Sequence, residues 1–284
     1  MKSWKGSRGE SMKHVLLVGN GFVGKCAAEM FRMNGWRVTT VNRTGMADEH
    51  ADVGSENSLQ KLKNRIEKPT HVVHCASASG GGVETYQQVY LDGCCNLAEL
   101  FPSIPILFTS STSVYPQTDG TCVDENSLTV LDRETGKILL EAEAAILKSN
   151  GIVARLAGIY GNGRSYLLKK FLSGEASMEE GGERILNHIH QWDAASAIVH
   201  LLDRADARGE IYNVCDSSPK SQIETYRELA RIFEKPLPPS ASRKLNSKRG
   251  WSHKAVSNAK LVSTGWRPKY ESFTEAAAEV SLTL

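Results

Sequence analysis

Three glycines close to the N-terminus have the spacing of a dinucleotide-binding turn. Gly19, Gly21 and Gly24 form GxGxxG inside the segment HVLLVGNGFVG. In such a turn the first glycine permits the tight bend, the second lets a pyrophosphate approach the backbone, and the third lets a helix pack closely on a strand. The phosphates then lie at the positive N-terminus of that helix. The predicted phosphate-binding residues are Gly19, Asn20, Gly21, Phe22, Val23 and Gly24.

The segment expected to contact the adenosine ribose has a basic residue and no acidic one. An acid about 20 residues after the first glycine favours NAD, because it hydrogen-bonds the ribose 2′-hydroxyl. Here the segment is Val41, Asn42, Arg43, Thr44. Arg43 can pair with a 2′-phosphate, with help from Asn42 and Thr44, so NADP is predicted in preference to NAD.

The predicted cofactor site also includes three residues that come later in the sequence. Asp52 and Val53 follow a short loop and are predicted to flank the adenine. Ala76 is the last residue of the apolar run THVVHCA and is predicted to contact the cofactor. His74, inside that run, is predicted to pack near the cofactor rather than to act as a base.

The elements that must position these residues alternate regularly in the first half of the chain. Apolar runs typical of strands occur at VLLVG, WRVTTVN, THVVHCA and IPILFTS, and helical patterns lie between them at KCAAEMFRMN, SLQKLKNRIE and TYQQVYLDGCCNLAELF. A helix over 136–149 and the run GIVARLAGIYG continue the alternation. Such alternation indicates βαβ units and a parallel sheet. We therefore predict an α/β fold, a Rossmann-type doubly wound parallel sheet with a small C-terminal substrate lobe.

Composition and pattern set the expected domains and compartment. The predicted divisions are a disordered leader over 1–12, a dinucleotide-binding core over 13–160 and a substrate lobe over 161–284, with segments near 185–215 returning to the core. A net charge of +2 gives no case for nucleic-acid binding. No apolar run reaches membrane-spanning length. The six cysteines have neither metal-site nor disulfide spacing, which predicts reduced thiols in a cytoplasmic protein.

Several segments together resemble one family, the extended short-chain dehydrogenase/reductases of the NAD-dependent epimerase/dehydratase type. They are GNGFVG, VVHCASA, FTSSTSVY, RLAGIYGNG, HIHQWDAASA, GEIYNVCD and STGWRPKY, and they occur in the family's order. GxGxxG in place of the more usual GxxGxxG resembles the atypical branch of this group. The resemblance implies a Rossmann domain for the cofactor and a small C-terminal domain for the substrate.

The resemblance also implies where catalysis would occur. Ser111 matches the family's Ser or Thr, four residues before the marker Tyr115 in FTSSTSVY, and its hydroxyl would hydrogen-bond a substrate carbonyl or alcohol. Thr135 and Leu139 occupy the positions of the family's catalytic Tyr and Lys, and neither can supply their acid–base chemistry. Tyr160, at the end of GIVARLAGIY, is a candidate pocket wall and proton donor, and Tyr115 is a second candidate to polarise a carbonyl.

Other departures and motifs narrow the interpretation. Tyr90 stands where the family has a structural Asn, and Thr112 and Ser113 stand where dehydratases carry an Asp-Glu pair, which disfavours a sugar dehydratase. The single YxxxK, Tyr166 to Lys170, lies in the predicted substrate lobe and is interpreted as a coincidence of helix composition. His188 and His190 form HxH without a third ligand, so no metal site is predicted.

Two functions from different classes remain open. The first is an NADP(H)-dependent oxidoreductase or epimerase-like enzyme acting on a small carbonyl or alcohol, or on a nucleotide-sugar-like substrate. The second is a non-catalytic NADP(H)-binding sensor or partner-binding protein. The substrate could be anionic, because basic residues gather over 243–249, although a solvated surface loop explains them as well. A monomer or a homodimer is expected.

Overall fold

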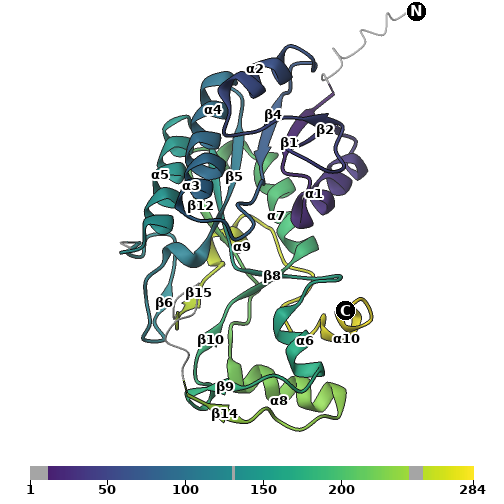
Figure 1. The fold of residues 1–284 in the computed structure, drawn as a ribbon, viewed down its shortest axis with the longest axis vertical. Coiled ribbons are helices and arrows are strands. Elements are labelled where there is room, and N and C mark those ends of the chain that lie inside the picture. Colours follow the sequence, from purple (N-terminus) through teal and green to yellow (C-terminus); the bar gives the residue numbers. More distant parts are fainter. Residues whose placement is uncertain (1–11, 130–131, 243–251) are drawn as a thin grey trace, which may run out of the picture.

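The structure is a computed structural model that describes residues 12–129, 132–242 and 252–284. The predicted leader over 1–12 lies outside the described residues except for its last residue. The basic segment over 243–249 lies entirely outside them. In the described part the chain forms two lobes: a larger one built on a sheet and a smaller one of short helices and strands (Figure 1).

A seven-stranded sheet forms the centre of the larger lobe. Its order is β12-β7-β5-β4-β1-β2-β3, and every neighbouring pair is parallel. The residues of β1 are all buried, as a strand covered on both faces requires. The strand bounds are β1 His14–Val18, β2 Arg37–Asn42, β3 Glu49–His50, β4 His71–His74, β5 Ile106–Ser111, β7 Ile152–Leu156 and β12 Ile211–Val214.

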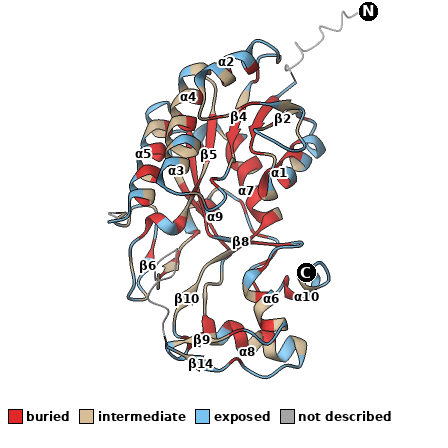
Figure 2. Ribbon diagram, in the orientation of Figure 1, coloured by how far each residue is buried: buried red, intermediate tan, exposed pale blue. Residues whose placement is uncertain are grey.

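Helices cover both faces of this sheet. α1 packs against α7 on one face, and α2, α4 and α5 lie together on the other (Figure 1). Buried residues concentrate in the strands and on the helix faces turned toward them (Figure 2). The helix bounds are α1 Phe22–Met33, α2 Glu56–Lys63, α3 Val83–Tyr86, α4 Gly93–Leu100, α5 Glu134–Lys148 and α7 Gln191–Leu202.

The predicted long helix after β4 is divided into three parts. α3 is followed by a π-helical stretch, Gln87–Asp92, and then by α4. A π-helical turn adds one residue to each hydrogen-bonded ring, a change that the apolar pattern of the sequence does not distinguish. The Tyr90 hydroxyl lies in this stretch and accepts a hydrogen bond from the Ala78 amide at 3.2 Å, which ties the loop after β4 to the helix.

The smaller lobe has a core of its own. Tyr160, Leu168, Phe171 and Tyr226 belong to a buried cluster separate from that of the sheet. The helices of the smaller lobe are α6 Tyr166–Leu172, α8 Gln222–Phe233 and α10 Ala277–Ser281, whereas α9 Ala259–Ser263 packs against β12 of the sheet. The remaining strands are β6 Cys122–Val123, β8 Gly158–Tyr160, β9 Met178–Glu179, β10 Ile185–Leu186, β11 His188–His190, β13 Lys220–Ser221, β14 Ser240–Ala241 and β15 Ala255–Val256.

The topology determines where a ligand can bind. β1 lies between β4 and β2, so the chain winds in opposite directions on its two sides. In open parallel sheets a ligand binds at the carboxyl ends of the strands where the winding reverses. The turn after β1, the end of β2 and the end of β4 meet there. The predicted α/β doubly wound sheet is thus confirmed, and α5 begins two residues before the predicted helix start at 136.

Candidate functional site

The three glycines of the first turn meet different surroundings. Gly19 has φ +106°, and a Cβ there would lie 2.3 Å from the Ala76 backbone nitrogen. A Cβ on Gly24 would lie 1.9 Å from the Gly19 carbonyl oxygen. A Cβ on Gly21 would meet nothing within 4 Å. Packing therefore requires the first and third glycines, whereas the second leaves open space beside the backbone.

That open space lies at the N-terminus of α1. Gly21 is the N-cap and provides no side-chain cap, and the first turn of α1 has no acidic residue. The free amides of a first helical turn carry partial positive charge and bind anions. The residues present therefore fit the pyrophosphate of a dinucleotide, which the glycine spacing predicts.

The end of β2 is held to the glycine turn by the Asn42 side chain. Its Oδ1 accepts a hydrogen bond from the Asn20 amide at 2.8 Å, and its Nδ2 donates to the Met46 carbonyl at 3.2 Å. The Asn20 side chain donates to the same carbonyl at 3.0 Å. Asn42 thus shapes the loop over 43–46, a role that the sequence pattern did not reveal.

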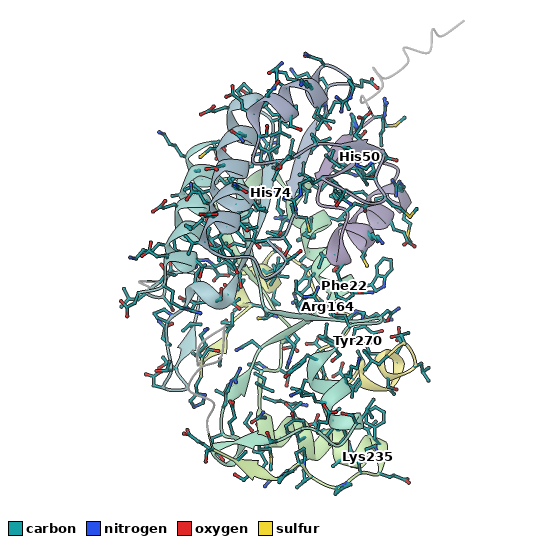
Figure 3. The ribbon with its side chains drawn as sticks, viewed as in Figure 1. Phe22, His50, His74, Arg164, Lys235 and Tyr270 are labelled. Carbon is teal, nitrogen blue, oxygen red and sulfur yellow. The ribbon has the colours of Figure 1, made fainter. Side chains whose placement is uncertain are left out.

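Arg43 and Thr44 are exposed in that loop. Among the described residues no carboxylate forms an ion pair with Arg43. His50 lies on the neighbouring strand β3, opposite Asn42, with its Nδ1 3.3 Å from the Asn42 carbonyl oxygen (Figure 3). The edge that would surround the adenosine ribose therefore presents the Arg43 guanidinium, while the nearby Asp48 carboxylate is occupied by Thr40 and Arg32.

The other predicted cofactor residues lie around the same edge. Asp52 accepts a hydrogen bond from the Gly54 amide at 3.0 Å and so caps its own turn. Val53 is buried, and its carbonyl accepts a hydrogen bond from Asn96 at 3.0 Å. Ala76 lies directly against Gly19. His74 is fully buried, and burial lowers its pKa to about 4, so the ring is neutral at physiological pH.

Ser111 ends β5 at the same edge of the sheet. It is half-buried, and its Oγ accepts a hydrogen bond from the Ser113 amide at 3.1 Å at the start of the 3-10 turn Thr112–Val114. This bond uses the oxygen and leaves the hydroxyl hydrogen available. Ser111 could therefore donate a hydrogen bond to a carbonyl oxygen.

A buried polar network lies beneath the Ser111 turn. Arg155 on β7 pairs with Glu143 on α5 at 2.6 Å, and both side chains are less than 5% exposed. Ser110 donates to the same carboxylate at 2.5 Å. Arg155 also donates to the Tyr115 hydroxyl at 2.9 Å, and that hydroxyl donates to Asn213 Oδ1 at 2.8 Å. The network thus fixes both ends of the turn, because Ser110 precedes Ser111 and Tyr115 follows Val114.

Tyr115 is occupied by these contacts. Its side chain is buried, burial raises the pKa of its phenol, and its carbonyl accepts a hydrogen bond from Lys254 Nζ at 2.8 Å. Lys254 is itself buried, which lowers its pKa to about 8. Tyr115 therefore serves as an anchor of the turn in this conformation, with no free hydroxyl for a substrate.

Tyr160 lies within the core of the smaller lobe. Its ring packs against His188, His190 and Phe273, and its hydroxyl has no partner among the described residues. Burial raises the pKa of the phenol, so Tyr160 stays protonated. The same packing accounts for the HxH pair, and no three described His, Cys, Asp or Glu side chains group as a metal site would require.

The positions of the missing Tyr and Lys lie on α5. Thr135 is half-buried in the first turn, and Leu139 is 4% exposed and belongs to the core of the sheet lobe. Tyr166 and Lys170, the YxxxK pair, are on α6 of the smaller lobe. Tyr166 is 76% exposed with the Lys170 ammonium 4.8 Å from its ring centre. This YxxxK pair is a contact on the surface of a helix.

Comparison with known proteins agrees with this architecture. The model of the NAD dependent epimerase/dehydratase family matches residues 15–215. Protein YeeZ of Escherichia coli K12 is 30% identical over 256 residues, which cover 84% of this chain and 90% of YeeZ. No helix among the described residues is both long enough and apolar enough to span a membrane.

Two solved structures have the same fold. MoeE5 in complex with UDP-glucose and NAD is 20% identical, with TM-score 0.75, and the match covers 93% of this chain and 96% of MoeE5. The human epimerase family protein SDR39U1 with NADPH is 17% identical, also with TM-score 0.75, and the match covers 95% of this chain and all of that one (100%). The glycine turn, the seven-stranded parallel sheet and the family match together show that this chain belongs to the NAD-dependent epimerase/dehydratase family.

Proposed function

We propose that this protein is an NADP(H)-dependent oxidoreductase or epimerase-like enzyme of the atypical extended short-chain dehydrogenase group. The observation that carries the cofactor choice is the edge at the end of β2. Arg43 is exposed and unpaired with any described carboxylate, and no acid follows β2 where a ribose-binding acid would lie. A guanidinium forms strong charge-assisted hydrogen bonds with a phosphate. The solved SDR39U1 structure contains NADPH, whereas MoeE5 contains NAD.

In this proposal the bound cofactor supplies or accepts the hydride. The glycine turn and the first turn of α1 hold its pyrophosphate, and Arg43 holds the 2′-phosphate with Thr44 beside it. Asn42 keeps the loop in place, and Asp52, Val53 and Ala76 border the adenosine side. The positions described above support these roles.

Ser111 is the group that we assign to the reacting end of the substrate. Its hydroxyl hydrogen would donate to a carbonyl oxygen of the substrate, and such a bond strengthens as negative charge develops on that oxygen. Water then supplies the proton, because Thr135 and Leu139 replace the usual Tyr and Lys. Tyr115 lies beneath Ser111, and Tyr160, which is buried in the core of the smaller lobe, is assigned no contact with the substrate.

The substrate that we propose is a small carbonyl or alcohol, or a nucleotide-sugar-like molecule. UDP-glucose in MoeE5 supports the second class, because that protein shares the fold. We further propose a cytoplasmic protein, because all six cysteines are free thiols, and one that is active as a monomer or homodimer.

The alternative is an NADP(H)-binding protein that does not turn over. Leu139 favours it, because a buried leucine in the core of α5 cannot orient a ribose or lower the pKa of a neighbour. Ser111 favours the enzyme, because its free hydroxyl hydrogen is otherwise unused. The two functions share the cofactor site and differ only in turnover.

A two-step experiment tests the proposal. Thermal unfolding with NADPH, NADP⁺, NADH and NAD⁺ should show the largest rise in melting temperature with the two phosphorylated forms, since a ligand that binds only the folded state stabilises it by mass action. NADPH oxidation is then followed over aldehydes, ketones and nucleotide sugars. A larger shift with NADH than with NADPH would refute the cofactor assignment. Tight NADPH binding without NADPH oxidation by any of these substrates would favour the binding protein.

A further inference from the structure

A cation of the smaller lobe lies beside the first residue of α1. The Arg164 guanidinium carbon is 5.0 Å from the centre of the Phe22 ring. Phe22 is the residue between Gly21 and Val23 in the glycine turn. Figure 3 shows Phe22 and Arg164 next to one another between the two lobes, so two segments more than a hundred residues apart in sequence meet at the predicted pyrophosphate site.

The backbone around Arg164 fixes its position. The Gly161 amide donates to the Arg164 carbonyl at 2.9 Å, and the Arg164 amide donates back to the Gly161 carbonyl at 3.0 Å. The Gly163 amide donates to Thr283 Oγ1 at 2.9 Å, which attaches this turn to the C-terminal segment. The turn directly follows β8, so the arginine is presented by a short, hydrogen-bonded loop.

Two positive groups, the N-terminus of α1 and the Arg164 guanidinium, lie close together at this contact. A helix N-terminus carries a partial positive charge, and a cation beside it is repelled. α1 has no acid in its first turn, and no carboxylate within the described ranges pairs with Arg164. An anion between the helix end and the guanidinium would turn this repulsion into attraction on both sides.

We propose that Arg164 binds the pyrophosphate of the cofactor from the side opposite the glycine turn. The Phe22 ring supports the guanidinium by a cation–π contact at the residue that directly follows Gly21. The cofactor would then be held by both lobes, and its binding would draw them together. This inference rests on the proposed cofactor site and adds a phosphate ligand from the smaller lobe.

The test compares ligands that have a pyrophosphate with one that has none. In Arg164→Ala, calorimetry should show affinity for NADP⁺ and for NAD⁺ reduced by the same factor, about ten- to a hundredfold, as expected for a lost charge-assisted contact. Affinity for 2′-AMP, which has the 2′-phosphate but no pyrophosphate, should stay within about twofold of the unaltered protein. Arg164→Lys, which keeps the charge without the paired donors, should lose less than Arg164→Ala.

Matched controls separate this contact from general effects. Arg231 is exposed on α8 of the same lobe, so Arg231→Ala removes the same charge far from α1 and should change none of the affinities. Phe22→Leu keeps the backbone amide but removes the aromatic ring, and should cause a smaller loss than Arg164→Ala.

The outcomes are distinguishable from failure of the cofactor assignment. Unchanged NADP⁺ affinity in Arg164→Ala, or an equal loss of NADP⁺ and 2′-AMP binding, would overturn the inference while leaving the proposed function intact. An unaltered protein that bound no dinucleotide would overturn both. A loss confined to NADP⁺ and absent for NAD⁺ would place Arg164 at the 2′-phosphate and would also refute the pyrophosphate contact.

Discussion

Two regions lie at the carboxyl ends of the strands: the predicted cofactor edge, formed by the loop after β2 together with Arg164 of the smaller lobe, and the Ser111 turn after β5, which β4 and β1 separate from β2. Their polar groups are used in opposite ways. At the cofactor edge, Arg43, Thr44 and Arg164 are exposed, and neither arginine forms an ion pair with a described carboxylate. Beneath the Ser111 turn, Arg155 and Glu143 are buried and bonded to each other.

This difference separates binding from stability. An exposed cation without a ligand costs the folded protein little free energy, because water solvates the charge. Buried ions must be paired, because each would otherwise keep an uncompensated desolvation cost. We therefore expect substitutions at the cofactor edge to change affinity with little effect on folding, and substitutions below Ser111 to change folding first.

The largest effect on binding is expected from Gly21→Asp. A side chain there would fill the open space beside α1, and its charge would repel the phosphates, so NADPH binding should become undetectable by calorimetry. The chain should still fold, since a Cβ at this position meets nothing within 4 Å. Gly24→Ala is the contrasting variant and should unfold more readily, because its Cβ would clash with the Gly19 carbonyl oxygen. Normal NADPH affinity in Gly21→Asp would disprove the site.

Arg155→Met should cause the largest loss of stability. Removing one partner of a buried ion pair leaves the other as an uncompensated buried charge, which lowers the free energy of unfolding by about 3–5 kcal/mol. Urea unfolding monitored by circular dichroism measures this loss. Replacing both partners, as Arg155→Met with Glu143→Leu, should cost less than the single change. A single change that costs under about 0.5 kcal/mol, the level of a surface substitution, would contradict the division between the two regions.

Ser111→Ala tests a residue intermediate between the two regions. Ser111 is half-buried, and its Oγ accepts a hydrogen bond from the Ser113 amide. If the protein is an enzyme, loss of this donor should lower kcat by about a hundredfold, the effect of removing one donor to a developing oxyanion. NADPH affinity should not change. Thr135→Ala is the control and should leave kcat within about twofold. Full activity of Ser111→Ala on a verified substrate would mean that the reacting centre lies elsewhere.

Arg43→Ala should have a smaller effect, limited to one cofactor. Losing a charge-assisted contact to the 2′-phosphate should cost about 1.5–3 kcal/mol of NADP⁺ binding and leave NAD⁺ binding nearly the same. Competition calorimetry with both cofactors measures the difference. The free energy of unfolding should stay within about 0.5 kcal/mol. Equal losses for NADP⁺ and NAD⁺ would show that Arg43 does not contact the 2′-phosphate.

The sequence predicted the parts of the fold that depend on local pattern. Apolar runs and glycine spacing located β1, the glycine turn and α1, because a buried parallel strand and a tight turn restrict residue types over a few consecutive positions. An arginine inside the apolar run VARLAG has to be neutralised if it is buried, but no local pattern identifies the partner of Arg155, Glu143, which approaches from α5.

Contacts between distant segments could not be predicted in this way. Lys254 reaches the Tyr115 carbonyl across 139 positions, and Asn213 reaches its hydroxyl across 98. Arg164 meets Phe22 only because the chain returns after β8. No spacing rule connects such residues. The contacts that hold the Ser111 turn, and the contact between the smaller lobe and the glycine turn, are therefore visible only in the structure. The π-helical stretch was missed because apolar periodicity hardly changes across it.

The Asn42 amide limits how the proposed cofactor preference of this protein could be changed. The usual route from NADP to NAD dependence installs an acid at the end of the second strand, where it can bind the ribose diol. Here that position uses an acceptor toward the Asn20 amide and a donor toward the Met46 carbonyl at once. Aspartate can reproduce the acceptor but not the donor, and its charge would face a carbonyl oxygen. Substitutions meant to change the cofactor preference should therefore be made in the loop over 43–46, with Asn42 retained because it holds that loop in place.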